Sequence, residues 1–181
     1  GGAGDQAAGA IGSGVIKFDQ SMISLGTSGV CFSPTNSFSP KTDQAVHSFC
    51  HCLPNTWHHM SVMLSATSCL SWISNIHKLK VNESIKKAEF FFNKKEELIL
   101  SPFFLPYLSG ERTPHNNSYL RGSFHMINTS SSLESLLYSV IEGISFGIKD
   151  GFDAVNNIDK NSKKIYLVGG GSKSQFWGNL I

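Results

Sequence analysis

Apolar runs separated by turn residues mark the first third of the chain. Two β-hairpins are predicted, the first from residues 22–25 and 30–32 and the second from residues 45–53 and 57–64. The small-residue turn Gly26-Thr27-Ser28-Gly29 joins the first pair, and Pro54-Asn55-Thr56 joins the second. Glycine and asparagine favour such turns because they adopt the backbone angles that a tight reversal needs. The serine- and proline-rich residues 33–43 between the hairpins are expected to form a loop.

Helical spacing becomes more frequent after the second hairpin. Helices are predicted over residues 6–14, 65–79 and 133–155, and a further helix runs through Phe90-Phe91-Phe92 with Asn82 as its candidate N-cap. Residues 98–108 are apolar and strand-like, residues 109–118 form a polar loop, and residues 165–168 form a buried strand that leads into three glycines. Hairpins followed by helices with interspersed strands indicate a mixed α and β fold.

Composition narrows the class of protein. The 181 residues are 40% hydrophobic and 15% charged, which allows a sizeable core and excludes a disordered chain. A net charge of +2 gives no reason to expect a nucleic-acid or membrane-surface partner. No apolar run approaches the roughly 20 residues that span a bilayer. The four cysteines, at positions 31, 50, 52 and 69, are expected to be reduced core residues.

Asp5 follows a glycine-containing loop and precedes a predicted helix. Glycines let a backbone approach a ligand closely, and a carboxylate beside such a loop is placed to contact a hydroxyl group or a metal-bound phosphate. An aspartate before a helix is also a common helix cap. On this segment alone, capping is the favoured interpretation.

Two further glycine-containing segments are candidates for phosphate or nucleotide binding. The turn at residues 26–29 offers backbone N–H groups and two hydroxyls without a bulky side chain, although it is equally an ordinary hairpin turn. Gly169-Gly170-Gly171-Ser172-Lys173-Ser174 lies between a predicted strand and a predicted helix, where a helix N-terminus favours an anion. Neither segment matches the dinucleotide-binding fingerprint or the Walker A motif, so neither a Rossmann fold nor a P-loop is indicated.

The order of these segments is similar to that of the actin-like ATPase superfamily. Five stretches narrow the likeness and resemble bacterial xylulokinases of the FGGY family of sugar kinases: residues 1–9, 24–29, 45–51, 61–70 and 104–117. The run FLPYLSGERTPHNN at residues 104–117 is highly specific, whereas the single glycine motifs are not. The resemblance covers nearly the whole chain and implies part of a ribonuclease-H-like, C-terminal ATP-binding domain. The expectation is a piece (residues 1–181) truncated at both ends and lacking the N-terminal sugar-binding domain.

The resemblance also implies residue roles. Asp5 matches the catalytic aspartate that accepts the proton of the attacking sugar hydroxyl, and Gln6 matches the adjacent position near the sugar. The implied ATP-binding residues are Gly26, Thr27 and Ser28 of the turn, Thr67 and Ser71 of the next helix, and Gly169, Gly170, Gly171 and Ser174 after the last strand. No residue of the chain is assigned as a metal ligand.

The expected reaction of the full-length protein is phosphorylation of D-xylulose to D-xylulose 5-phosphate with ATP and Mg²⁺. The alternative within the family is a kinase for another sugar or polyol, such as ribulose, gluconate or glycerol. The resemblance implies a cytoplasmic protein, allows a homodimer, and gives no nucleic-acid or membrane partner. Because the absent half supplies much of the sugar pocket in this family, the isolated chain is expected to have negligible kinase activity.

Two other classes stay open. One is a nucleotide-binding pseudokinase without turnover, against which Asp5 and the intact turn at residues 26–29 argue. The other is an actin-like or chaperone-type ATPase with a conformational output, against which the segment at residues 108–115 argues.

The chain departs from the family pattern at two positions. Met126 replaces the second glycine of the family's Gly-x-Phe-x-Gly-Leu, here Gly122-Ser123-Phe124-His125-Met126-Ile127. If that glycine has a positive φ, a bulky residue there strains the loop. Ser135 stands where the family prefers an acidic or amide residue.

Several side chains allow both a specific and an ordinary interpretation. Histidines and cysteines crowd residues 47–59, but their spacing is not that of a zinc finger, and alternate strand residues point to opposite faces. Roles in the core and on the strand surface are therefore favoured over a metal site. The tryptophans at 57, 72 and 177 are expected to pack rather than to stack on adenine. Glu111 and Arg112 form either a charged element near a closing cleft or an exposed ion pair.

Overall fold

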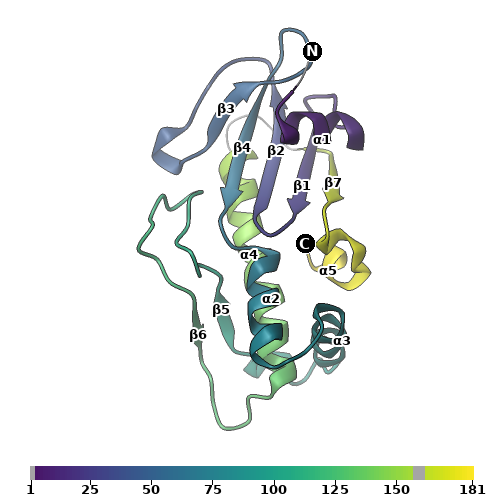
Figure 1. Cartoon of the computed structure of the whole chain (residues 1–181), viewed down its shortest axis with the longest axis vertical. Coiled ribbons are helices and arrows are strands. Elements are labelled where there is room, and N and C mark those ends of the chain that lie inside the picture. The colour runs from purple at the N-terminus through teal and green to yellow at the C-terminus, as the bar shows by residue number, and fades with distance from the viewer. Residues whose placement is uncertain (1–2, 157–161) are drawn as a thin grey trace.

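A five-stranded mixed sheet is the centre of the molecule. The computed structural model describes residues 3–156 and 162–181. The sheet has the order β3-β4-β2-β1-β7 (Figure 1). Its strands are β1 (Gln20–Leu25), β2 (Gly29–Thr35), β3 (His47–Cys50), β4 (Trp57–Met63) and β7 (Lys164–Val168). β7 pairs with β1 in parallel, and the other neighbours are antiparallel.

Both predicted hairpins are present. In the first, Leu25 pairs with Gly29, so residues 26–28 form a three-residue connection. The second hairpin is shorter than predicted, because β3 covers only His47–Cys50 of residues 45–53, whereas β4 begins at Trp57 as predicted and ends at Met63. The loop predicted over residues 33–43 is wrong at its start, because β2 continues through Pro34 to Thr35.

The side chains of β1 and β2 alternate between two apolar layers, as the two-residue period of a strand requires. Met22 and Phe32 pack with helix α1 (Asp5–Ser13) in a small core that also contains Ala7 and Ala10. The next residues along the strands, such as Ile23, belong to the main core on the other face. That face is covered by helix α4 (Leu133–Asn156), which contacts β2 and β4.

A glycine stripe lets α4 lie directly on its neighbours. Gly143, Gly147 and Gly151 recur every four residues and are buried. A Cβ atom on Gly143 would lie 2.2 Å from the backbone oxygen of Phe104, so only glycine fits at this crossing. The predicted helix over residues 133–155 is confirmed. Its glycine-lined face lets its backbone lie directly against neighbouring segments such as Phe104.

The remaining elements extend beyond one end of the sheet. They are α2 (Thr67–Ile76), α3 (Val81–Phe92), the short strands β5 (Phe103–Leu105) and β6 (Ser123–His125), and α5 (Gln175–Leu180). Helices α2 and α3 pack with α4 (Figure 1). A buried hydrogen bond of 2.8 Å between the Ser74 and Ser84 hydroxyls links α2 to α3.

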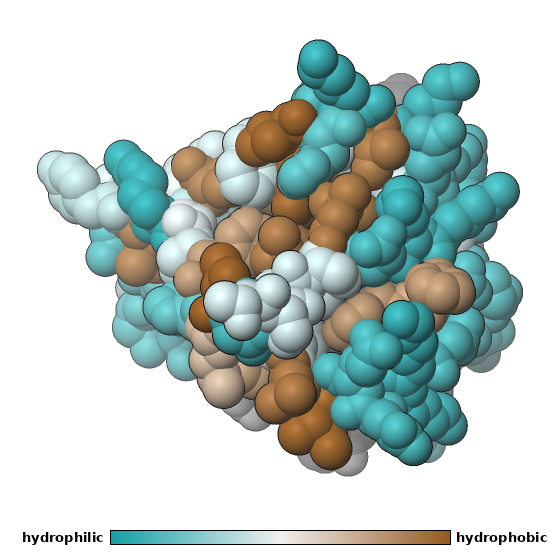
Figure 2. All heavy atoms as spheres, turned by 90° about the horizontal axis from the view of Figure 1, so that it is seen from below, coloured by the Kyte–Doolittle hydropathy of each residue, from teal (hydrophilic) through white to brown (hydrophobic). Residues whose placement is uncertain are grey.

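Two predicted details of this region are wrong. Residues 98–108 do not form one strand, because they contain a 3-10 helix (Leu98–Leu100) and only the short β5, which Pro102 and Pro106 flank. Ile99 is 84% exposed, and Figure 2 shows such apolar side chains at the surface among hydrophilic ones. Asn82 does not cap α3. The helix begins at Val81, and the Glu83 carboxylate accepts a hydrogen bond of 3.0 Å from the backbone N–H of Lys80.

Burial corrects two further predictions. β7 is not a buried strand, since its residues are exposed or half-buried and it lies at the edge of the described sheet. Only Cys31 and Cys69 are core residues, whereas Cys50 and Cys52 are exposed. All four cysteines are free.

Met126 has a φ of +59°, so it occupies the left-handed region that glycine adopts without strain. The positive φ that would make a bulky residue strained at this position is therefore present. The side chain is 65% exposed, which places the strain in a surface loop after β6 rather than in the core.

The search for membrane-spanning helices covered residues 3–156 and 162–181. None of the helices described there combines the length and the apolar character needed to cross a bilayer.

Candidate active site

The turn at residues 26–28 is held by the start of α2. The backbone N–H of Thr67 donates to the carbonyl oxygen of Gly26 at 3.1 Å, and that of Ala66 donates to Thr27 at 2.9 Å. These bonds satisfy amides that a helix N-terminus otherwise leaves without partners. The turn therefore directs its carbonyls to the helix. Within the described residues, the backbone N–H groups of Thr27 and Ser28 have no acceptor, and both residues are exposed.

The glycine loop after β7 packs against the residue that leads into this turn. Gly169 has a φ of +92°, and a Cβ atom there would lie 2.7 Å from the backbone oxygen of Leu25. A Cβ atom on Gly171 would lie 2.9 Å from the Cβ of Leu25 and 3.4 Å from the Cγ2 of Thr67. The fold thus brings together the turn, the start of α2 and the glycine loop, which are far apart in the sequence. We call these three segments (residues 26–28, 67 and 169–171) the turn–glycine cluster.

Ser71 and Ser174 flank this cluster, and the backbone N–H of Ser174 donates a hydrogen bond of 3.2 Å to the carbonyl oxygen of Gly171. Ser71 is half-buried on α2, one helical turn after Thr67. Ser174 is the N-cap of α5, and its Oγ accepts a hydrogen bond of 3.2 Å from the backbone N–H of Trp177. The oxygen of Ser174 is therefore used in capping, and the contacts of both serines with a nucleotide stay predictions.

Asp5 is the first residue of α1, and it is exposed. The N-cap is Gly4, and no side chain caps the helix, so the interpretation of Asp5 as an N-cap is wrong in its position. The Oδ1 atom of Asp5 accepts a hydrogen bond of 2.8 Å from the backbone N–H of Gln6. A carboxylate in the first turn also interacts favourably with the helix dipole.

An open hollow of about 310 Å³ lies beside Asp5 and Gln6. Its other wall comes from β3 and β4. It is lined by Gly4, Asp5, Gln6, Ala7, Phe49, Cys50, His58 and Met60. The turn–glycine cluster contributes no residue to it. In Figure 1, α1 lies over the upper part of the sheet and the β1–β2 turn lies at the lower end. The structure therefore gathers the predicted nucleotide residues in one place and the predicted catalytic pair in another.

The histidines beside this hollow are buried and packed on aromatic rings. His58 is 4% exposed and stacks on Phe32 with ring centroids 4.2 Å apart. Burial, assisted by the neighbouring His51 and His59, lowers the pKa of His58 to about 4. Burial also lowers the pKa of His51, whose Nδ1 accepts a hydrogen bond of 3.3 Å from the backbone N–H of Leu53. Among residues 3–156 and 162–181, no three His, Cys, Asp or Glu side chains form a group that can hold a metal ion.

Glu111 is the polar side chain whose environment the sequence pattern did not reveal. It is 3% exposed, and its Oε1 accepts hydrogen bonds from the backbone N–H groups of Leu64, at 2.9 Å, and Arg112, at 2.7 Å. Burial raises the pKa of its carboxyl group, and these two hydrogen bonds oppose that change. The alternative of an exposed Glu111–Arg112 ion pair is therefore wrong. The mixture of charged and small residues around it gave no signal of burial.

The tryptophan at position 177 packs, as predicted. It is 1% exposed, and its Nε1 donates a hydrogen bond of 3.2 Å to the Ser145 hydroxyl in the core. Trp72 is 39% exposed and stacks on Phe104 at 6.2 Å between ring centroids.

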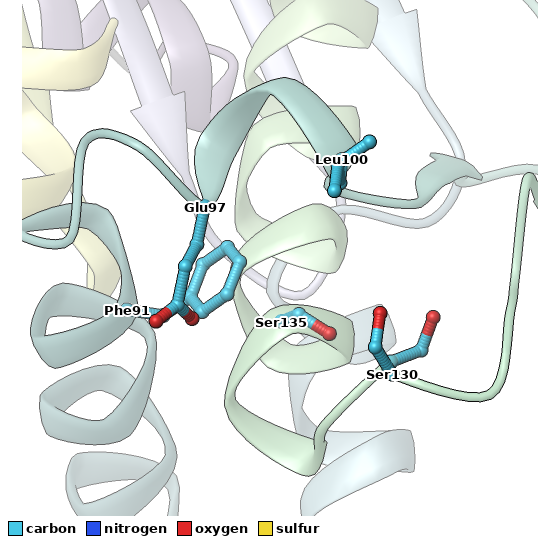
Figure 3. Close-up of a pocket in the computed structure, with 6 residues that line it drawn as sticks. Phe91, Glu97, Leu100, Ser130 and Ser135 are labelled. Atoms are coloured by element: carbon cyan, nitrogen blue, oxygen red, sulfur yellow. The ribbon is translucent and has the colours of Figure 1, made fainter.

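A separate hollow of about 130 Å³ lies between α3, the 3-10 helix after it and the start of α4 (Figure 3). Ser135, one of the two departures from the family pattern, lines it together with Phe91. The Ser135 hydroxyl donates to the carbonyl oxygen of Ser132 at 2.8 Å, and that of Ser130 donates to Asn128 Oδ1 at 2.6 Å. These hydroxyl groups are already engaged within the chain, and the hollow shares no residue with the turn–glycine cluster or with Asp5.

Comparison with known proteins places this arrangement in a family. The sequence profile described as "FGGY family of carbohydrate kinases, C-terminal domain" matches residues 21–181. The chain therefore belongs to the FGGY family of carbohydrate kinases. Its mixed α and β fold is that of an actin-like ATPase domain, as the sequence predicted.

Individual relatives narrow the comparison further. The chain is 42% identical over 180 residues to a xylulose kinase from Escherichia coli strain K12, a match that covers 99% of the chain and 37% of that protein. A crystal structure described as a xyloylose kinase from Brucella ovis superimposes with a TM-score of 0.88 at 41% identity, over 100% of this chain and 37% of the other. A xylulose kinase structure from Bifidobacterium adolescentis gives a TM-score of 0.82 at 25% identity, over 97% and 34%. The chain thus spans little more than a third of the relatives it matches.

Proposed function

We propose that residues 1–181 are part of the C-terminal, ATP-binding half of a sugar kinase whose substrate is D-xylulose and whose product is D-xylulose 5-phosphate. The turn–glycine cluster is the observation that carries the proposal. It joins three segments that the resemblance assigns to ATP, namely residues 26–28, Thr67 and residues 169–171. The E. coli and B. ovis relatives support xylulose as the substrate, since both are described as kinases of this sugar.

The cluster has the chemistry of a nucleotide site. The backbone N–H groups of Thr27 and Ser28 and the hydroxyl of Thr27 are donors suited to phosphate oxygens. Gly169 and Gly171 leave no Cβ atom between the loop and Leu25, so the loop backbone stays flush with the end of β1. A nucleotide can then lie along the backbone of the loop and place its phosphates at the turn.

Asp5 is proposed as the general base, with Gln6 beside the sugar. In the proposed reaction the sugar hydroxyl attacks the γ-phosphorus, its proton passes to the Asp5 carboxylate, and ADP leaves. Phosphoryl transfer has a loose transition state, so positioning and charge stabilisation contribute more than early proton removal. A carboxylate at the surface of a hollow is accessible to such a hydroxyl.

When bound with the nucleotide, Mg²⁺ would supply positive charge beside the phosphates. The hydroxyls of Thr27 and Ser28 are oxygen donors of the kind that Mg²⁺ accepts, and most of its ligands would come from phosphate and water. A cytoplasmic location and a homodimer of the full-length protein follow from the same resemblance and are proposed with it.

The test is a coupled assay of ADP release by the full-length protein that contains this chain. D-xylulose, D-ribulose, L-ribulose, glycerol and gluconate are compared, with Asp5→Ala and the exposed Asp43→Ala as a matched pair of variants. We expect D-xylulose to be preferred and Asp5→Ala to reduce turnover by about 10²–10⁴-fold, the usual contribution of a general base. Asp43→Ala should keep the parent rate, and both variants should bind ADP like the parent.

Three results would contradict the proposal. If the protein prefers another sugar, the assignment of D-xylulose as its substrate is wrong. Full turnover in Asp5→Ala removes the base assignment, and nucleotide binding without any sugar-dependent turnover in the parent indicates a pseudokinase.

A further inference from the structure

The last residues of β4 extend beyond its pairing with β3, so their backbone groups on that edge need other hydrogen-bond partners. The last β3–β4 pair is His47 with Met60, so the following residues of β4 have no β3 neighbour. Backbone groups on alternate residues of a strand point to the same edge. Here they belong to Val62 and to Leu64, which directly follows the last residue of β4. Both have partners in the segment at residues 111–113.

Residues 111–113 make the hydrogen bonds to this edge that a neighbouring strand would otherwise make, mainly through side-chain oxygens. The N–H of Thr113 donates to the carbonyl oxygen of Val62 at 3.1 Å, and the Thr113 Oγ1 accepts from the N–H of Val62 at 3.1 Å. The Glu111 carboxylate accepts from the N–H of Leu64 at 2.9 Å. Reciprocal backbone bonds of 2.9 and 2.8 Å between Glu111 and Asn117 close the loop that carries these groups.

Leu64 connects this loop to the turn. While its N–H is held by Glu111, its carbonyl oxygen accepts a hydrogen bond of 3.3 Å from the Ser28 hydroxyl. The residues that follow Leu64 donate to the turn, since Ser68 reaches the carbonyl oxygen of Thr27 with both its N–H, at 3.3 Å, and its hydroxyl, at 3.0 Å. The position of the 64–68 segment therefore sets the position of the turn.

We propose that Glu111 is a positioning residue for the turn at residues 26–28. Its buried carboxylate fixes the Leu64 amide and thereby holds the 64–68 segment and the turn in one arrangement. That the turn binds phosphate rests on the proposed function, but the mechanical link does not. Glu111 touches none of the proposed reactants and acts only through Leu64.

Hydrogen exchange tests this link without any ligand. In the full-length protein, Glu111→Ala should speed exchange at the amides of Ala66, Thr67 and Ser68 by about 10-fold or more, because local opening sets exchange rates. Glu111→Gln keeps an oxygen acceptor of the same reach and should stay within about 3-fold of the parent. Thr113→Val is the matched control, because it removes a buried hydroxyl from the same loop without touching Leu64. It should loosen Val62 and leave residues 66–68 within about 3-fold.

If Glu111→Ala does not fold, Glu111→Asp serves the same purpose, because it keeps the charge but shortens the reach to Leu64. Equal exchange at residues 66–68 in the parent and in the Glu111 variant would overturn the proposal. So would an equal increase in Thr113→Val, because the effect would then be general loosening of the loop.

Calorimetric titration with ADP separates this inference from the proposed function. We expect Glu111→Ala to weaken ADP binding by about 10-fold and Glu111→Gln or Thr113→Val by less than about 3-fold, the size of an indirect positioning effect. If the parent protein binds no ADP, the nucleotide site is wrong, and the exchange pattern alone then decides the role of Glu111. If ADP binds equally to the parent and to Glu111→Ala although exchange changes, the arrangement of the turn is not what binds nucleotide, and Glu111 has no part in the reaction.

Discussion

The turn–glycine cluster and the Asp5 helix are built in different ways. In the cluster, carbonyl groups of the turn are bonded to the start of α2, and Gly169 and Gly171 have no room for a side chain. Helix α1 instead packs on a small core, and a Cβ atom added to its Gly9 or Gly12 would meet nothing within 4 Å. Close backbone contacts and hydrogen bonds hold the turn–glycine cluster in place, whereas a few apolar side chains hold α1 on the sheet.

The two regions therefore differ in the substitutions that they tolerate. Backbone contacts at van der Waals limits leave no room to relax, because packed interiors transmit a displacement to their neighbours. A helix with open space around its glycines accepts small additions. Substitutions that add one methyl group in each region therefore test the comparison directly. A change of pH tests the packing beneath α1, where His58 stacks on Phe32.

The largest effect is expected for Gly169→Ala. Alanine is strained at this position because φ is +92° and the added Cβ atom would lie 2.7 Å from the backbone oxygen of Leu25. A non-glycine residue in such a conformation costs about 1–3 kcal/mol, and the clash adds to that cost. We expect a lower free energy of unfolding in urea and ADP binding weakened by about 10-fold or more, since about 1.4 kcal/mol corresponds to tenfold in affinity.

Gly170→Ala is the control for that substitution. Gly170 has a φ of −63°, and a Cβ atom there would have no neighbour within 4 Å. The control should change stability by less than about 0.5 kcal/mol, as for surface positions. Equal losses in the two variants would mean that the loop as a whole, and not the contact with Leu25, sets the geometry.

The next effect is a loss of stability in mild acid that arises from His58. Its folded pKa of about 4 lies below the ordinary histidine value of 6.5, so the unfolded chain binds more protons between these values. The stabilisation is complete above about pH 6.5 and is lost as the pH falls toward 4. With a reduction for partial solvation, the loss should be about 1–3 kcal/mol, measured by urea unfolding at several pH values.

His58→Phe should reduce this pH dependence, because phenylalanine keeps the stacking on Phe32 and does not titrate. The buried His51, whose pKa is also lowered, keeps its own contribution. The exposed His77→Gln is the matched control and should keep the full dependence. An unchanged slope in His58→Phe would assign the acid sensitivity to other groups.

The smallest effect is a gain in stability from Gly12→Ala. Alanine has a higher helix propensity, and the open space around Gly12 accepts the added methyl group. We expect the free energy of unfolding to rise by about 0.5–1 kcal/mol. The reverse change at the exposed Ala8, Ala8→Gly, should lower it by a similar amount. A loss in Gly12→Ala would show that α1 is packed as tightly as the cluster.

Much of the fold was predictable because local patterns decide it. The first hairpin follows from its turn residues, and α4 follows from a helical period that the structure confirms over Leu133–Asn156. Errors arose where long-range contacts decide. The apolar composition of residues 165–168 predicted burial, but β7 lies at the edge of the described sheet. The cap of α3 depends on Glu83, which a search for a residue like Asn82 before the helix does not find.

The candidate site divides in the same way. Glycine and small hydroxyl residues marked the turn and the loop after β7, since few other residues suit such backbones. The sequence carried no sign that both would meet at Leu25, nor that Glu111 would reach Leu64 from a polar loop. These meetings depend on the strand order β3-β4-β2-β1-β7, which periodicity alone does not determine.

The parallel pairing of β1 with β7 has a consequence for the order of assembly. Gln20 and Tyr166, which contact each other across this pair, are 146 positions apart, whereas β1 and β2 meet across a three-residue turn. Distant pairing requires closure of a long loop and therefore comes late in folding. During synthesis, the turn at residues 26–28 can form well before the glycine loop leaves the ribosome, so the proposed nucleotide site is completed only when β7 joins the sheet.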